Sequence, residues 1–124
     1  MSGPAPRALT DVEVTDLLAQ QQFGALATVK RSGHPHLSTV LYRWDAAERT
    51  IRVSTTADRL KARQIRADPR VALHVQGPNV WSFGVVEGRA EIIEDSPDTT
   101  APDRRVTVVL KADRLYGTAL DIPG

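Results

Sequence analysis

One stretch of the sequence joins two apolar strands through a basic helix, and it reads Ser54-Thr55-Thr56-Ala57-Asp58-Arg59-Leu60-Lys61-Ala62-Arg63-Gln64-Ile65-Arg66-Ala67-Asp68-Pro69-Arg70. A strand that ends in hydroxyl residues leaves backbone N–H groups free at the start of the next helix, and the helix dipole favours an anion there. Between residues 58 and 70, five basic residues against two acidic ones give +3, although the whole chain carries a formal charge of only +1. The pattern favours a phosphate site at the start of this helix.

The same helix has a second interpretation. Basic helices are often solvated faces, whose apolar residues pack inward while the cations extend into water. Leu60 and Ile65 would provide that inner side. The hydroxyl residues before the helix favour a ligand, because a surface helix does not need them. Two charge-assisted contacts to a phosphate are worth roughly 1.5 to 3 kcal/mol each.

The composition of the 124 residues excludes several classes of protein. Apolar residues make up 41% and charged residues 25%, which is typical of one globular domain. The absence of cysteine excludes disulfides, thiolate metal sites and cysteine nucleophiles. No apolar run approaches the roughly 20 residues that span a bilayer, and residues 1–7 lack the apolar core of a signal peptide. We therefore expect a cytoplasmic protein without a membrane partner and, given the near-neutral charge, without a nucleic-acid partner.

Outward from the basic helix, the apolar pattern predicts a mainly β fold. Alternating or β-branched segments predict six strands, which cover residues 23–30, 36–44, 50–55, 70–76, 80–93 and 105–111. Gly84 and Gly88 in the fifth strand predict a bulge or a close approach of the backbone. Polar segments predict turns at 31–35 and 45–49 and a loop over 94–104.

Helices and a tail complete the predicted fold. Thr10 followed by Glu13 fits a capping box at the start of a helix over about residues 11–21. Residues 113–117 predict one helical turn that ends at a glycine. Residues 1–9 predict a disordered tail, and 10–124 a single domain. The expected architecture is a six-stranded, or nearly six-stranded, antiparallel barrel with two short helices.

The histidines and aromatic residues do not predict a separate site. His34 and His36 flank a proline at a turn, so with His74 they lack the convergent geometry of metal ligands, and we predict no metal site. Trp81 and Phe83 alternate on a predicted strand, which is typical of a core or an interface.

Four motifs follow one another along the chain: Phe-Gly-x-Leu-Ala-Thr-Val from residue 23, Ser-Gly-His-Pro-His from 32, Arg-x-Lys-Ala-Arg-x-Ile-Arg-x-Asp-Pro-Arg-Val-Ala-Leu from 59, and Val-Glu-Gly-Arg-Ala-Glu-Ile from 86. In this order they resemble the split β-barrel flavin-reductase families related to pyridoxamine 5'-phosphate oxidase. Within those families the chain looks most like the deazaflavin-dependent branch that uses coenzyme F420. The resemblance runs from about residue 23 to 93, and the motif from residue 59 is its most specific part.

The resemblance implies an FMN-binding type of split barrel, a homodimer with a cofactor groove at each end of its interface. One group of residues would hold the cofactor phosphate: Ser54, Thr55, Thr56, Arg59 and Lys61. A second group would lie along the ring, with the imidazole as a hydrogen-bond donor to it: His36, Ser38, Thr39, Val40 and Leu41. Arg63 and Arg66 would meet the acidic tail of the deazaflavin, although a solvated role for Arg66 stays open.

The function that the resemblance implies is an F420-dependent oxidoreductase, which transfers a hydride between the deazaflavin and a small unsaturated or quinone-like substrate. The alternatives are an FMN-binding enzyme like pyridoxamine phosphate oxidase and a non-catalytic cofactor-binding protein. Because the cofactor itself moves the hydride, no catalytic side chain is assigned. The loop at 94–104 is shorter than in the families that the chain resembles, which would leave the substrate side of the pocket open.

Overall fold

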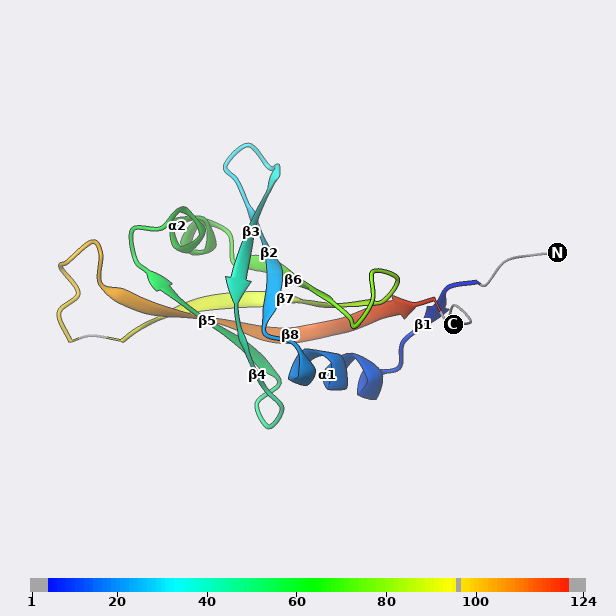
Figure 1. The fold of residues 1–124 in the computed structure, drawn as a ribbon. Helices are drawn as coiled ribbons and strands as arrows, with labels where there is room; N and C mark the ends of the chain where they lie inside the picture. The colour runs from blue at the N-terminus through cyan, green and yellow to red at the C-terminus, as the bar shows by residue number, and fades with distance from the viewer. Residues whose placement is uncertain (1–4, 96, 121–124) are drawn as a thin grey trace.

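The computed structural model describes residues 5–95 and 97–120 as eight strands and two helices (Figure 1). The strands are β1 (Arg7–Ala8), β2 (Phe23–Val29), β3 (Pro35–Leu41), β4 (Arg43–Asp45), β5 (Thr50–Thr56), β6 (Arg70–Gln76), β7 (Phe83–Glu94) and β8 (Arg105–Ala119). The helices are α1 (Asp11–Gln20) and α2 (Leu60–Ala67). The strands pair antiparallel in the order β3-β2-β6-β7-β8-β5-β4, with β1 added on β8. The fold is thus mainly β, with one sheet that does not close.

The two ends of this sheet are consecutive in the chain, because only Tyr42 separates β3 from β4. The sheet must therefore curl until its first and last strands meet. The Tyr42 ring is buried at this corner, its hydroxyl donates to the Leu18 carbonyl at 2.7 Å, and its backbone N–H donates to the Gln22 carbonyl at 2.9 Å. The corner is thereby fixed to the C-terminal end of α1.

The core lies inside the curled sheet and beneath the two helices. Successive side chains of a strand point to opposite faces, and the inward positions of β2, β5, β6 and β8 are large and apolar. They include Leu26, Ile51, Leu73, Val75, Val108 and Leu110. Helix α1 packs on β7 and β8, and α2 packs on β7 and β2. None of the helices in the described residues is both long enough and apolar enough to cross a membrane.

Several predictions from local sequence are confirmed. The Thr10 side chain accepts from the Glu13 N–H while the Glu13 carboxylate accepts from the Thr10 N–H, so the capping box at the start of α1 is present. Strand β6 has the predicted bounds. The ladder between β7 and β8 shifts register between Glu87 and Gly88, and a Cβ on Gly88 would clash with the Lys111 carbonyl.

Other predictions are wrong, and pairing between distant strands explains why. The segment 36–44 is two strands, because the chain turns at Tyr42 from pairing with β2 to pairing with β5. Residues 113–117 are not helical but extend β8, since they pair with the first half of β7. The split of residues 36–44 and the additional strand β1 bring the strand count to eight instead of six.

The start of β7 and the N-terminal segment that contains β1 also differ from the prediction. Strand β7 starts at Phe83, because Asn79 organises a turn in which its Oδ1 accepts from the Trp81 N–H at 2.9 Å and its carbonyl accepts from the Ser82 N–H at 3.2 Å. Trp81 is consequently exposed. Within the predicted tail, Arg7–Ala8 forms β1 and pairs with Thr118 and Ala119, while residues 1–4 lie outside the described residues.

Replacing Tyr42 with Phe should lower the free energy of unfolding by about 1 to 2 kcal/mol, because the Leu18 carbonyl loses its donor while the ring remains. Burial also raises the pKa of Tyr42 to about 12. Its native state therefore favours the neutral phenol, and this stabilisation is complete below the ordinary pKa of about 10 and is lost as the pH rises through 12. Urea unfolding of both proteins at neutral and alkaline pH measures the effect. Equal stability at neutral pH would show that the hydrogen bond contributes nothing.

Candidate functional site

A groove of about 400 Å³ lies where β3 and β5 run close to each other without pairing. Among the described residues, β3 pairs only with β2, and β5 after Arg52 pairs only with β8, so each strand presents an open row of backbone N–H and C=O groups. The groove is lined by residues from β3, β5, the start of α2 and β8: Thr39, Val40, Leu41, Val53, Ser54, Thr55, Thr56, Arg59, Lys61 and Arg105. The open strand edges make this a site where a planar ligand can bind to backbone groups.

Three cations gather at one end of the groove. Arg59 immediately precedes α2, Lys61 lies in its first turn, and Arg105 begins β8. Arg105 Nη2 donates to Ser54 Oγ at 2.7 Å. Within residues 5–95 and 97–120, none of the three cations forms an ion pair. This end of the groove therefore carries positive charge that no ion pair among the described residues neutralises.

Partial burial lowers the pKa of Lys61, and the neighbouring Arg59 lowers it further. Both causes disfavour the charged ammonium form, and a bound anion would oppose the repulsion from Arg59. A bound anion beside Lys61 would therefore favour its charged form.

The start of α2 adds backbone donors to these cations. Arg59 occupies the N-cap position in an extended conformation, and no side chain caps the helix. The Ala62 N–H donates to the Arg59 carbonyl at 3.1 Å, while the N–H groups of Leu60 and Lys61 have no acceptor among the described residues and favour an anion. The Thr56 hydroxyl donates to Asp58 Oδ1 at 2.6 Å, so its proton is already engaged next to an acidic side chain.

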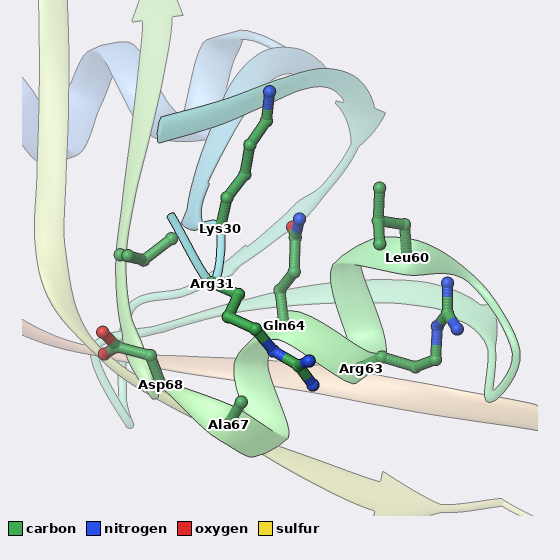
Figure 2. A pocket seen from close by; sticks show the side chains of 8 residues that line it. Lys30, Arg31, Leu60, Arg63, Gln64, Ala67 and Asp68 are labelled. Carbon is green, nitrogen blue, oxygen red and sulfur yellow. The ribbon is translucent and has the colours of Figure 1, made fainter. Parts of the chain in front are cut away.

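Most of the residues predicted from the sequence for the cofactor line this groove, namely Thr39, Val40, Leu41, Ser54, Thr55, Thr56, Arg59 and Lys61. His36, Ser38 and Arg63 do not line it. His36 Nδ1 lies 3.0 Å from Gln64 Oε1, and Arg63 borders a different hollow on α2 (Figure 2). Arg66 donates to the Ala57 carbonyl at 3.3 Å and lies 3.7 Å from Glu94, so it connects α2 to the segment before it and to the end of β7.

Sequence reasoning missed Arg105 as a site residue. It stands opposite Thr56 in the ladder between β5 and β8, 49 positions away in the chain. Its place at the start of a strand was recognisable, but only the pairing of that strand with β5 brings it to the groove. No local signal in the sequence identifies such a partner.

The loop before Arg105 is attached next to the groove. Arg104 binds the Glu94 carboxylate through two hydrogen bonds of 2.7 and 2.9 Å, and its carbonyl accepts from the Ala57 N–H at 3.0 Å. These contacts hold both ends of the loop beside the segment that leads into α2.

The histidines remain apart in the structure. His34 is exposed in the turn between β2 and β3, while the His74 ring stacks on Phe83 with centroids 5.0 Å apart and an interplanar angle of 21°. In the described part of the chain, no group of three or more His, Asp or Glu residues is arranged to hold a metal ion.

Comparison with known families places this groove in context. The family model described as pyridoxamine 5'-phosphate oxidase matches residues 10–115, which include both groove strands and α2. The chain belongs to this family. The pyridoxamine 5'-phosphate oxidase family is one of flavin-binding oxidoreductases, and its split barrel accounts for the unclosed sheet described above.

Solved structures share this fold. A FAD-binding protein from Mesorhizobium loti is 22% identical with a TM-score of 0.80, and the match covers 97% of this chain and 100% of that one. An F420 reductase is 29% identical with a TM-score of 0.68, covering 81% and 93%. An FMN-binding protein related to pyridoxamine 5'-phosphate oxidase from Nostoc punctiforme is 14% identical with a TM-score of 0.64, covering 82% and 88%.

Lys61 should react with an amine-acylating reagent faster than Lys30 and Lys111 at mildly alkaline pH, because its lowered pKa leaves more free amine. Peptide mass spectrometry after brief labelling measures the three rates. Arg59→Gln should slow the reaction at Lys61, since it removes one cause of the lowered pKa. Equal rates at all three lysines would contradict the electrostatic description of the groove.

Proposed function

We propose that this member of the pyridoxamine 5'-phosphate oxidase family is an F420-dependent oxidoreductase, which transfers a hydride between the deazaflavin coenzyme and a small unsaturated or quinone-like substrate. The observation that carries the proposal is the groove itself, in which two open strand edges lead to Arg59 and Lys61, cations that form no ion pair within the described residues. The likeness to an F420 reductase at 29% identity supports the choice of cofactor.

The residues of the groove fit the two ends of such a cofactor. Arg59, Lys61 and the open N–H groups of α2 would hold the phosphate, and Arg105 with Ser54 would complete that end. The ring would lie along residues 39–41 of β3, whose free edge offers backbone donors and acceptors. When bound, the deazaflavin supplies the hydride chemistry, and the protein orients it and excludes water.

FMN is the alternative cofactor, because its phosphate would occupy the same cations, and an FMN-binding protein shares this fold. A protein that binds the cofactor without turnover is the other alternative. In both alternatives, Arg59 and Lys61 would bind the phosphate of the cofactor. They differ from the F420 proposal in the preferred cofactor and in whether a substrate is reduced.

The protein is proposed to act as a homodimer. On the outer face of the β2–β3 pair, Phe23, Leu37 and Leu41 are each at least 60% exposed, and Phe23 stands opposite Leu41 in the ladder. Exposed apolar patches of this kind are typical of interaction surfaces. Leu41 also lines the groove, so a second copy on this face would contribute a wall of the cofactor site.

Leu37→Glu should convert the proposed dimer to a monomer, because it places a charge on this apolar face without touching the groove. Val12→Glu is the matched control, since Val12 is equally exposed (65%) on α1. Size-exclusion chromatography with light scattering gives the molar mass. A wild-type monomer, or a dimer that survives Leu37→Glu, would contradict this interface.

Fluorescence titration should show that the wild-type protein binds the deazaflavin more tightly than FMN. Lys61→Ala should weaken deazaflavin binding roughly 10- to 100-fold, the loss expected for one charge-assisted contact of about 1.5 to 3 kcal/mol. Lys111→Ala is the control, because Lys111 lies outside the groove on β8.

Tighter binding of FMN would assign the protein to the FMN alternative. Tight deazaflavin binding without reduction of any enone or quinone in a substrate panel would leave the non-catalytic alternative. Unchanged affinity in Lys61→Ala would contradict the phosphate site.

A further inference from the structure

A second hollow, of about 560 Å³, lies between α2 and the turn that joins β2 to β3 (Figure 2). It is larger than the groove and shares no lining residue with it. The turn and the end of β2 contribute one side, and α2 with the residue after it contributes the other: Val29, Lys30, Arg31, Leu60, Arg63, Gln64, Ala67 and Asp68. The proposed cofactor groove leaves this hollow unexplained.

The hollow is bordered by three cations, Lys30, Arg31 and Arg63, which form no ion pair within the described residues. Its one acidic side chain, Asp68, is already bound by Arg70 through hydrogen bonds of 3.0 and 2.7 Å. The hydrogen bonds from Arg70 lower the pKa of Asp68 to about 2, so this carboxylate stays charged and engaged. The hollow therefore presents unneutralised positive charge.

Gln64 adds a polar group to the hollow. The residue is only 8% exposed, yet it lines the hollow. Its Oε1 accepts from the Thr28 hydroxyl at 2.5 Å and lies 3.0 Å from His36 Nδ1. Across the described residues, Gln64 Nε2 donates no hydrogen bond, and it is not among the fully buried atoms that lack a partner. The amide nitrogen therefore reaches solvent, and a ligand in the hollow would offer it an acceptor.

The backbone holds both sides of the hollow in place. In the turn, the Lys30 N–H donates to the His34 carbonyl at 2.9 Å, and the Gly33 N–H donates to the Lys30 carbonyl at 2.8 Å. Gly33 has a φ of 91°, a conformation that other residues rarely adopt. On α2, Leu60, Gln64 and Ala67 recur at helical spacing and share one side of the helix. The cations are thus carried by two ordered elements that face each other.

We propose that this hollow is a second anion-binding site, which takes a carboxylate or phosphate group of a multiply charged organic ligand. Lys30, Arg31, Arg63 and the Gln64 amide would bind the anion. Val29, Leu60 and Ala67 would contact the adjoining apolar part.

The anion has two possible sources with the same chemistry. Arg59 and Arg63 are one helical turn, about 6 Å, apart along α2, so the far end of a long cofactor would reach from the groove to the hollow. A separate metabolite is the other source. The site rests on its own residues and does not depend on the proposed function.

The test uses inorganic tripolyphosphate as the probe and the double variant Arg31→Gln/Arg63→Gln. Calorimetry should show at least a tenfold loss of tripolyphosphate affinity in this variant, because two charge-assisted contacts are removed. Arg43→Gln/Arg52→Gln is the matched control, since these exposed arginines border a different part of the surface and their loss changes the net charge equally. Adding tripolyphosphate should also shift the NMR signal of the Gln64 side-chain amide.

Equal losses in the two double variants would overturn the proposal, because they would reveal only nonspecific attraction. Shifts confined to residues of the groove would overturn it too. If the far end of the cofactor is the source, the hollow variant, Arg31→Gln/Arg63→Gln, should bind the deazaflavin more weakly than the wild type and should bind FMN with unchanged affinity. If a separate ligand is the source, both cofactors should bind as before while tripolyphosphate binding is lost.

The two proposals can fail independently. Should Lys61→Ala leave cofactor binding intact while the hollow variant still loses tripolyphosphate, the cofactor groove is wrong and the second anion site stands.

Discussion

The fold depends on one covalent constraint, the single residue that joins the two ends of the sheet. Tyr42 lies between β3 and β4, which are the first and last strands of the pairing order. An antiparallel sheet with its ends joined in this way has to curl, and burial of the Tyr42 ring with its hydrogen bond to Leu18 fixes the bend on α1. Among the described residues, the short β4 pairs only with residues 50–52 of β5. The rest of β5 and all of β3 therefore lie near each other without hydrogen bonds between the two strands. The groove is a direct consequence of that incomplete closure.

Helix α2 then divides the surface beside the groove. It connects β5 to β6 and buries only Ala62, Gln64 and Ile65, so most of its cations remain accessible. Arg59 and Lys61 border the groove, whereas Arg63 borders the second hollow. Arg66 differs from them, because Ala57 and Glu94 engage its guanidinium. One short helix therefore separates the cationic groove from the cationic second hollow, and the contacts of Arg66 attach this helix to the rest of the fold.

Local sequence predicted those features that local chemistry determines, such as the capping box at Thr10 and the bounds of β6. It failed where distant strands decide the outcome. The alternation of β3 continues through Tyr42 into β4, so no change of pattern marks the bend. Residues 113–117 have a helical signature, but pairing with β7 keeps them extended. Arg105 and the hollow were missed for the same reason, because a sequence does not show which cations come together across the fold.

The distribution of charge around α2 is difficult to explain as a merely solvated surface. Its two acidic neighbours have local partners, since Asp58 accepts from Thr56 and Asp68 binds Arg70. The repulsion from Arg59 is one cause of the lowered pKa of Lys61. Departures from local stability are expected at functional sites. Bound anions on both sides of α2 would offset this repulsion.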